Sequence, residues 1–316
     1  MKYKKIGNDL EVSAIALGTW AMGGNYFGAT DDSQSIRTIE AAIDSGINLI
    51  DTAPAYGRGH SESIVGKAIK GKRDKVIIST KCGLTWANED AKTLRNLKAE
   101  SLRKEIENSF TRLGTDMIDI YFIHWPDPDT PLEETLGELN SFKEAGKIRY
   151  IGVSNFDLEL LKKASNIAEI DCIQPRYSIL DRDIEGDILD FCREKQIEIL
   201  SYGSLAGGIL TGKYTEESQL KEGDKRSKFY RYFKAPYRSK ALKLVEVLKR
   251  IAENHNSPVS HVALNWVRQQ EGITSALVGA KTVGQAKENA AAADWDLSKE
   301  ELKKIEQAYQ DVVGLE

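Results

Sequence analysis

The sequence has few of the features that mark membrane, secreted or disulfide-rich proteins. In its 316 residues no stretch approaches the ~18 consecutive apolar residues of a membrane-spanning helix, and the N-terminus has no uninterrupted apolar segment typical of a signal peptide. Its cysteines, Cys82, Cys172 and Cys192, are odd in number and show no CxxC spacing. We therefore expect a soluble cytoplasmic protein with reduced thiols and no membrane partner.

Motifs for nucleic acids, metals and common nucleotide folds are also missing. The net charge is -4 and the Lys and Arg residues are scattered, so we expect no nucleic-acid partner. No His or Cys cluster has metal-ligand spacing, so no metal is expected. There is no G-x-G-x-x-G motif, which argues against an open doubly wound sheet that binds a dinucleotide. Residues 207–213 match G-x-x-x-x-G-K, but Tyr214 replaces the Ser or Thr that would bind Mg²⁺, so a phosphate-hydrolysing role is not expected.

What the sequence does contain is a repeated alternation of short apolar segments and amphipathic segments. The apolar segments are predicted strands at 14–20, 47–50, 76–81, 117–125, 147–156, 170–174, 197–202 and 274–281. Predicted helices lie at 32–45, 60–70, 98–113, 131–145, after Asp157, and at 185–195, 239–255, 259–270, 282–292 and 298–312.

Eight alternating repeats predict an α/β protein with a closed parallel sheet, the (β/α)8 or TIM barrel. We interpret residues 1–316 as one such domain, with an N-terminal β-hairpin at 3–6 and 10–14 and extra helices after strand seven and at the C-terminus. The open doubly wound sheet is the alternative. Residues 203–238 are predicted to be a long irregular segment with a functional role.

Ionisable residues follow three consecutive strands. Asp51, Lys81 and His124 each end a predicted strand, and Tyr56 lies in the turn after Asp51. Strand ends of a barrel meet at one face, so these side chains are expected to converge there. A buried carboxylate needs a cation, which Lys81 would supply. We expect Lys81 to lower the pKa of Tyr56 and neutral His124 to hydrogen-bond a substrate carbonyl oxygen.

This set of side chains predicts proton delivery to a carbonyl or alcohol carbon. No activated nucleophile and no metal ligand set accompany it, so a cofactor must supply the remaining chemistry. The ordered motifs around it resemble those of the aldo-keto reductase superfamily over nearly the whole chain. The matching strings are LGTW at 17–20, DTAPAYG at 51–57, STK at 79–81, IHWPD at 123–127, GVSNF at 152–156, Gln174, SYGSLAGGILTGK at 201–213 and GAKTVGQAKEN at 279–289.

The resemblance implies a (β/α)8 barrel that binds NADP(H) in an extended form without a Rossmann fold. It implies a catalytic tetrad of Asp51, Tyr56, Lys81 and His124, with Tyr56 as general acid in reduction. It also implies cofactor contacts by Gly18, Thr19, Trp20, Asp51, Ser154, Asn155, Gln174, Tyr202, Gly203, Ser204, Leu205, Gly207, Lys213, Gly279, Lys281, Thr282, Gln285, Glu288 and Asn289. Among these, Ser154, Asn155 and Gln174 would hold the nicotinamide carboxamide, and Tyr202 would stack on its ring.

Two departures from the family pattern affect the cofactor site. Ser204 stands where many relatives have proline, and Gln285 stands where many have arginine. NADPH is therefore the expected cofactor, with NADH as an alternative. The expected substrate pocket comprises Trp20, Tyr56, Trp86, His124 and Trp125, although each tryptophan could equally serve in packing.

The function that follows is reversible NADPH-dependent reduction of an aldehyde or ketone to an alcohol. The small-molecule carbonyl or alcohol would be the partner, and a monomer and a homo-oligomer are both compatible with the sequence. The alternative is a nucleotide-bound regulatory or sensor protein of the same fold, because potassium-channel β-subunits resemble this family too.

Overall fold

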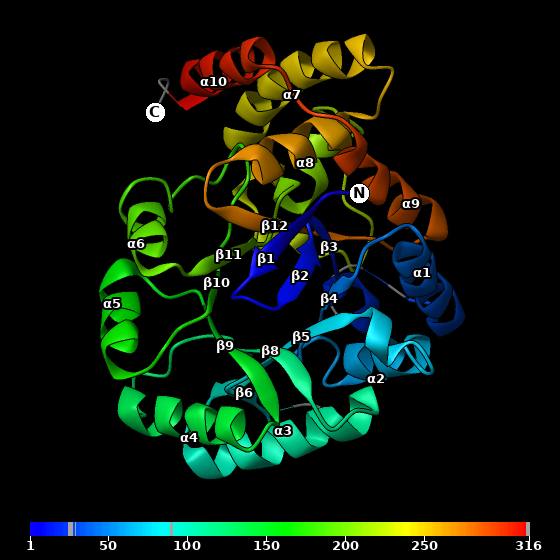
Figure 1. The fold of residues 1–316 in the computed structure, drawn as a ribbon. Helices are drawn as coiled ribbons and strands as arrows, with labels where there is room; N and C mark the ends of the chain where they lie inside the picture. Colours follow the sequence, from blue (N-terminus) through cyan, green and yellow to red (C-terminus); the bar gives the residue numbers. More distant parts are fainter. Residues whose placement is uncertain (25–27, 29, 89–90, 314–316) are drawn as a thin grey trace.

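Eight parallel strands close into a barrel in the computed structural model, which describes residues 1–24, 28, 30–88 and 91–313. Around the barrel the strands follow the order β10-β11-β12-β3-β4-β5-β8-β9, so neighbours in sequence are neighbours in space (Figure 1). The strands are β3 (Ile15–Gly18), β4 (Leu49–Asp51), β5 (Ile77–Cys82), β8 (Ile118–Ile123), β9 (Ile148–Ser154), β10 (Cys172–Gln174), β11 (Glu198–Ser201) and β12 (Ile273–Gly279). The predicted (β/α)8 barrel is confirmed.

Helices surround the barrel and pack their apolar faces on it or on one another (Figure 1). They are α1 (Asp32–Asp44), α2 (His60–Ala68), α3 (Ala99–Leu113), α4 (Leu132–Glu144), α5 (Leu158–Ile167), α6 (Asp187–Lys195), α7 (Tyr237–Asn254), α8 (Val259–Gln269), α9 (Val283–Ala291) and α10 (Lys299–Val313). The side chains of Asp31, Asp157 and Thr282 each accept a hydrogen bond from the backbone N–H three residues later, which explains where α1, α5 and α9 begin.

The period-two alternation of the strands decides which residues enter the barrel. Leu49, Ile77 and Ile120 belong to an inner apolar cluster, whereas Ile50 and Ile78 belong to the layer between the sheet and the helices. Positions two and four residues beyond the inner ones therefore also face inward. On β4, β5 and the end of β8 this places Asp51, Lys81 and His124 on the interior face at the C-terminal end.

The opposite end of the barrel is covered by the hairpin of β1 (Tyr3–Ile6) and β2 (Leu10–Ser13), which was predicted. Ile6, Leu10 and Val12 pack into the inner apolar cluster. The Lys4 ammonium donates to the carbonyl oxygens of Arg268 and Ile273. The barrel is thus plugged at this end, and only the C-terminal end of the strands is left for a site.

Two segments differ from the sequence prediction. A short hairpin of β6 (Leu84–Thr85) and β7 (Leu94–Arg95) follows β5 and was not predicted. The segment 203–238 is not wholly irregular, because it contains the 3₁₀ turns η3 (Ala206–Thr211), η4 (Arg226–Lys228) and η5 (Arg231–Phe233), and α7 already begins in it. Further 3₁₀ turns are η1 (Trp20–Gly23), η2 (Arg73–Lys75) and η6 (Ala292–Asp294).

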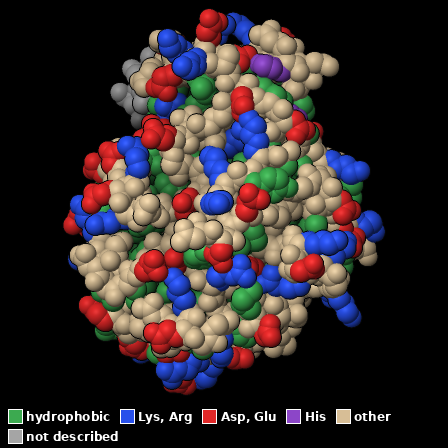
Figure 2. Space-filling view, in the orientation of Figure 1, with side chains coloured by type: hydrophobic (Ala, Val, Ile, Leu, Met, Phe, Trp, Pro, Cys, Tyr) green, Lys and Arg blue, Asp and Glu red, His purple; other side chains and the backbone are tan. Residues whose placement is uncertain are grey.

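Three expectations from the sequence concerned disulfides, membrane-spanning helices and metal sites. Cys82, Cys172 and Cys192 are free thiols and are buried in β5, β10 and α6. Within the described ranges no helix is long and apolar enough to cross a membrane, and no group of side chains there could hold a metal ion. Figure 2 shows Lys and Arg side chains interspersed with Asp and Glu over the face in view.

Candidate functional site

A buried ion pair forms the centre of the site. The Lys81 ammonium donates to Asp51 Oδ1 at 2.9 Å and Oδ2 at 2.8 Å, and also to the Thr52 carbonyl oxygen at 2.8 Å. Asp51 Oδ1 accepts further hydrogen bonds from Ser79 Oγ and Gln174 Nε2, both at 2.8 Å. Burial lowers the pKa of Lys81, and the Asp51 carboxylate opposes this shift. The predicted pairing of Asp51 with Lys81 is confirmed.

Tyr56 lies beside this ion pair. The Lys81 ammonium donates to the Tyr56 hydroxyl at 3.2 Å, so the phenolic hydrogen is left to donate elsewhere. The turn that carries Tyr56 packs tightly on η1, because a Cβ on Gly57, whose φ is +67°, would lie 2.3 Å from the Gly23 carbonyl oxygen. The backbone of the turn therefore fixes the position of the phenol.

The expectation of a lowered Tyr56 pKa beside Lys81 is wrong. Burial, followed by the negative charge of Asp51, raises the pKa of Tyr56 well above its ordinary value. The physical reason is that the phenolate would lose its hydration in this site and would be repelled by the Asp51 carboxylate. The phenol is thus held protonated, which is the state that a proton donor requires.

His124 lies across from Tyr56. The two rings meet edge to face, with centroids 6.0 Å apart and an interplanar angle of 85°. Burial, and to a lesser degree the Lys81 charge, lowers the pKa of His124 well below its ordinary value. The imidazole is therefore neutral at neutral pH, as the sequence predicted, and one ring nitrogen can donate a hydrogen bond to an oxygen atom.

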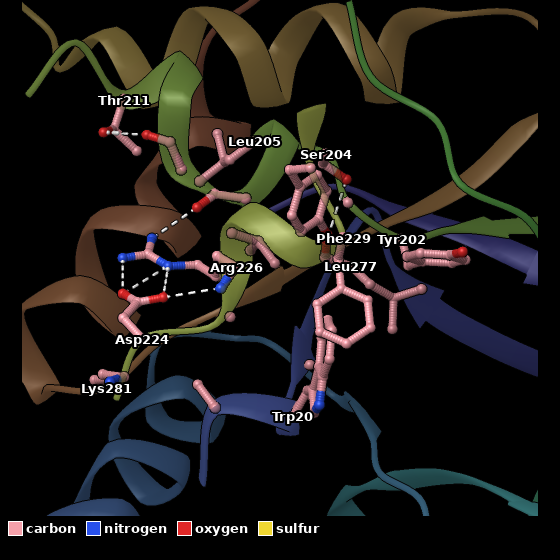
Figure 3. A pocket seen from close by; sticks show the side chains of 18 of the residues that line it. Trp20, Tyr202, Ser204, Leu205, Thr211, Asp224, Arg226, Phe229, Leu277 and Lys281 are labelled. Carbon is pink, nitrogen blue, oxygen red and sulfur yellow. Dashed lines mark hydrogen bonds and ion pairs between the residues drawn. The ribbon is translucent and has the colours of Figure 1, made fainter. Parts of the chain in front are cut away.

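These groups open on a cavity of about 1400 Å³ that runs across the C-terminal end of the barrel (Figure 3). One end is lined by Trp20, Tyr56 and His124, and the other by Lys281 and Asn289. All predicted site residues line this cavity except Thr19, Lys81, Thr282 and Trp86.

The four exceptions have other positions. Lys81 lies behind Asp51 and Tyr56, and Thr282 caps α9. Thr19 is buried, and its hydroxyl donates to the Asp51 carbonyl oxygen. Trp86 is in the loop of the β6–β7 hairpin, with the Arg58 guanidinium 5.5 Å from its ring.

Hydrogen bonds connect amide and hydroxyl groups at neighbouring strand ends near His124. Asn155 Nδ2 donates to the His124 carbonyl oxygen at 2.9 Å, and the Tyr202 hydroxyl donates to Asn155 Oδ1 at 2.9 Å. Ser154 Oγ donates to the Gln174 carbonyl oxygen at 2.8 Å. The structure thus brings Ser154, Asn155, Gln174 and Tyr202 together beside the tetrad, on strands β9, β10 and the end of β11.

The far end of the cavity is built around the start of α9. Gln285 Oε1 accepts a hydrogen bond from the Lys281 backbone N–H at 2.7 Å. Ser260 Oγ donates to Glu288 Oε1 at 2.8 Å, and Asn289 Nδ2 donates to the Gly279 carbonyl oxygen at 3.3 Å. Burial lowers the pKa of Lys281, the charges of Arg226, Lys213 and Lys221 lower it further, and the charge of Asp224 opposes them. Positive charge is therefore concentrated at this end.

Residues that the sequence reasoning did not single out complete the cavity. Arg226 donates to the Gly207 carbonyl oxygen at 2.7 Å and pairs with Asp224, and both lie on the same side of the cavity as Lys281 (Figure 3). Phe229 meets the Trp20 ring edge to face at 5.2 Å. Tyr230 and Arg176 also line the cavity. For Asp224, Arg226, Phe229 and Tyr230 the signal available in the sequence was the concentration of aromatic and charged residues within 203–238, whereas Arg176 lies outside that segment.

The chemistry of the cavity fits a nicotinamide dinucleotide phosphate. Amide, hydroxyl and aromatic side chains lie at the tetrad end, and cations lie at the other end, as a molecule with a polar aromatic head and a phosphorylated tail requires. Between them, Gly207 and Gly208 have φ values of +69° and +102°, and a Cβ on Gly207 would lie 2.6 Å from the Tyr230 ring. This segment therefore keeps a bare backbone against the cavity.

Comparison with known proteins gives a consistent match. The Aldo/keto reductase family profile matches residues 14–310. The aldo-keto reductase YhdN of Bacillus subtilis is 44% identical, over 100% of this chain and 97% of the relative. The NADH-specific methylglyoxal reductase of Escherichia coli is 38% identical, over 92% of each chain.

Solved structures agree. The glycerol dehydrogenase AKR11B4 from Gluconobacter oxydans superimposes with a TM-score of 0.91 and 39% identity, covering 98% of this chain and 96% of that one. An aldo-keto reductase from Klebsiella pneumoniae in complex with NADPH superimposes with a TM-score of 0.76 and 30% identity, over 98% and 96% of the two chains.

Proposed function

The chain belongs to the aldo/keto reductase family, and we propose that it is an oxidoreductase that reduces an aldehyde or ketone to an alcohol with NADPH, reversibly. The single observation that carries this proposal is the position of the Tyr56 hydroxyl. It lies 3.2 Å from the Lys81 ammonium, which is itself held by Asp51, and it lines a cavity that extends to the cationic end at Lys281.

Different residues of the cavity would bind different parts of the cofactor. Ser154, Asn155 and Gln174 would hold the nicotinamide carboxamide, and Tyr202 would lie against its ring. Lys213 and Lys281, with Gln285 at the start of α9, would hold the phosphates. When bound, the nicotinamide supplies or accepts the hydride at the substrate carbon.

The tetrad of Asp51, Tyr56, Lys81 and His124 would transfer a proton to the substrate oxygen. Tyr56 donates its phenolic proton to the substrate oxygen, and the Lys81 ammonium then stabilises the phenolate that is left. Asp51 keeps Lys81 charged and fixes its position, since both carboxylate oxygens accept from the ammonium. Neutral His124 donates a hydrogen bond to the same substrate oxygen and orients it.

The substrate would enter beside an aromatic wall. Trp20, Phe229 and Trp125 line the tetrad end of the cavity, and Trp20 also stacks near Tyr56, with ring centroids 6.1 Å apart. These rings would limit the access of water to the reacting oxygen and present a largely apolar surface to the substrate. Small aldehydes, ketones and polyols are the compounds to test first, because the relatives are named for methylglyoxal and glycerol.

The dinucleotide preference is proposed to be NADPH over NADH. The cations around Lys281 would bind a 2′-phosphate, whereas Gln285 offers no charge to it. The Escherichia coli relative is named as NADH-specific, so both dinucleotides belong in the experiment. A cytoplasmic location stays a prediction, and a monomer and a homo-oligomer are both compatible with the proposed function.

The experiment is a binding titration followed by turnover. Quenching of tryptophan fluorescence by NADPH and by NADH would give both dissociation constants, since Trp20 and Trp125 line the cavity. Loss of reduced-nicotinamide absorbance with methylglyoxal, glyceraldehyde and simple ketones would then give turnover. Tight binding with no turnover of any carbonyl compound or alcohol would reject the enzyme and favour the sensor alternative. Absence of binding would reject both.

A further inference from the structure

Arg176 is held beside Tyr202 by the backbone. It follows β10 by two residues, and its segment continues the sheet past the strand end. The Tyr202 N–H donates to the Pro175 carbonyl oxygen at 2.9 Å, and the Tyr177 N–H donates to the Tyr202 carbonyl oxygen at 2.9 Å. The Arg176 side chain also lies against Gly203, because a Cβ there would be at contact distance, 3.4 Å, from Arg176 Cγ. The guanidinium therefore has a fixed place at the cavity wall.

The guanidinium lies among aromatic rings. Its Cζ is 5.9 Å from the centre of the Tyr202 ring and 5.3 Å from that of Tyr230. Its Nε is buried and has no hydrogen-bond partner. Among the described residues Arg176 makes no ion pair. Asp181 acts on it electrostatically without an ion-pair contact, and the Asp181 carboxylate accepts hydrogen bonds from Ser178 and Tyr232.

The position of Arg176 is at the tetrad end of the cavity. The Tyr202 hydroxyl donates to Asn155, and Asn155 donates to the His124 carbonyl oxygen. Within the tetrad the charges cancel, because Asp51 and Lys81 form an ion pair and His124 is neutral, and Asp181 offsets only part of the Arg176 charge. Arg176 thus contributes a net positive charge beside the tyrosine that would lie against the nicotinamide.

We propose that Arg176 makes this site select the reduced, uncharged nicotinamide over the oxidised, positively charged one. The inference rests on the proposed function, since it requires a nicotinamide beside Tyr202. A cation near the ring repels only the oxidised form, and the repulsion is strong because the surroundings are poorly hydrated. With partial compensation by Asp181, we expect the oxidised form to bind about three- to tenfold more weakly than it would without the Arg176 charge.

The measurement is the ratio of two dissociation constants, for NADP⁺ and for NADPH, obtained by tryptophan fluorescence. Arg176→Met should lower this ratio about three- to tenfold, whereas Arg176→Lys, which keeps the charge, should leave it within about twofold of the wild type. Arg103→Met is the matched control, because it removes an arginine charge from the exposed face of α3. It should leave the ratio unchanged.

The outcomes separate a charge effect from a structural one. If Arg176 only supports Tyr202, Arg176→Met weakens both dinucleotides equally and the unchanged ratio overturns the proposal, while the proposed function stands. If the wild type binds neither dinucleotide, the proposed function fails and this proposal fails with it. Arg176→Gln, which keeps hydrogen-bonding groups, replaces the Met variant if that variant loses cooperative thermal unfolding, and the same ratio decides.

Discussion

The single ammonium of Lys81 donates to both carboxylate oxygens of Asp51, at 2.9 and 2.8 Å, where the side chains are only 1% and 5% exposed. Two charges are therefore kept inside the barrel, and each makes the burial of the other tolerable. The pair organises the site, because Lys81 also contacts Tyr56 and Asp51 also accepts from Gln174. The consequences of this arrangement can be tested one side chain at a time.

Asp51→Asn should destabilise the protein strongly. The amide has no negative charge, so the Lys81 ammonium would be left buried without compensation. We therefore expect the free energy of unfolding to fall by about 3–5 kcal/mol. Chemical denaturation followed by fluorescence measures this. Ser79→Ala is the control, since it removes one hydrogen bond to the same carboxylate and should cost about 1 kcal/mol. Equal losses in the two variants would contradict a buried charge effect.

Tyr56→Phe should abolish most turnover but leave the fold and the cofactor site in place. The phenylalanine keeps the ring beside Trp20 and His124 and removes only the acidic proton, so we expect kcat for a good carbonyl substrate to fall at least about 100-fold. The dissociation constant for NADPH should change less than about threefold. Turnover at the wild-type rate would exclude Tyr56 as the proton donor.

Glu105 on α3 should make stability depend on pH. Burial raises the pKa of its carboxyl from 4.5 to about 7, although the Gly83 N–H and the Ser101 hydroxyl both donate to it. Because the folded state binds more protons than the unfolded state between these values, stability is lost as pH rises through this window.

The variant that tests this is Glu105→Gln, which cannot ionise. Its free energy of unfolding relative to wild type should rise by about 3 kcal/mol between about pH 5 and about pH 8. Denaturant titrations at both pH values measure the difference. Glu107→Gln removes an exposed carboxylate of the same helix and should show no such trend. A constant difference for Glu105→Gln would contradict the raised pKa.

Gly207→Ala should damage the cavity wall between its two ends. At a φ of +69° an alanine costs about 1–2 kcal/mol in backbone strain, and its Cβ would lie 2.6 Å from the Tyr230 ring. We expect a lower melting temperature and weaker binding of NADPH. Gly137→Ala is the matched control, because it lies in α4, away from the cavity, and its Cβ would meet nothing within 4 Å. If both variants behave alike, Gly207 has no special role.

The fold was predictable because the spacing of apolar residues along a strand or helix shows which of its faces is buried. Asp51, Lys81 and His124 could be placed together since a barrel brings strand ends to one edge. The β6–β7 hairpin was missed because its strands are two residues each and only half-buried or exposed, so no alternation marks them. Arg176 was missed because a lone arginine after proline carries no periodic signal, and its aromatic neighbours lie far along the chain.

Two local predictions failed because they depend on interactions that cannot be read from the amino-acid sequence. The pKa of Tyr56 moved up instead of down, since proximity to Lys81 was predictable but the extent of dehydration was not. The string Thr130-Pro131-Leu132-Glu133 predicts a capping box that opens the helix at 131–145, yet the Thr130 hydroxyl donates to Asp127 Oδ2 and the residue preceding α4 is Pro131. In both cases a competing partner from the folded surroundings decided the outcome.

The buried thiols offer a built-in probe of breathing motions. Cys82 and Cys172 lie on different barrel strands and Cys192 lies on an outer helix, and burial raises the pKa of each. An alkylating reagent should therefore modify none of them until its own neighbourhood opens. Mass spectrometry of the unmutated chain after timed exposure to such a reagent would rank three regions by their local opening, with and without a nucleotide present.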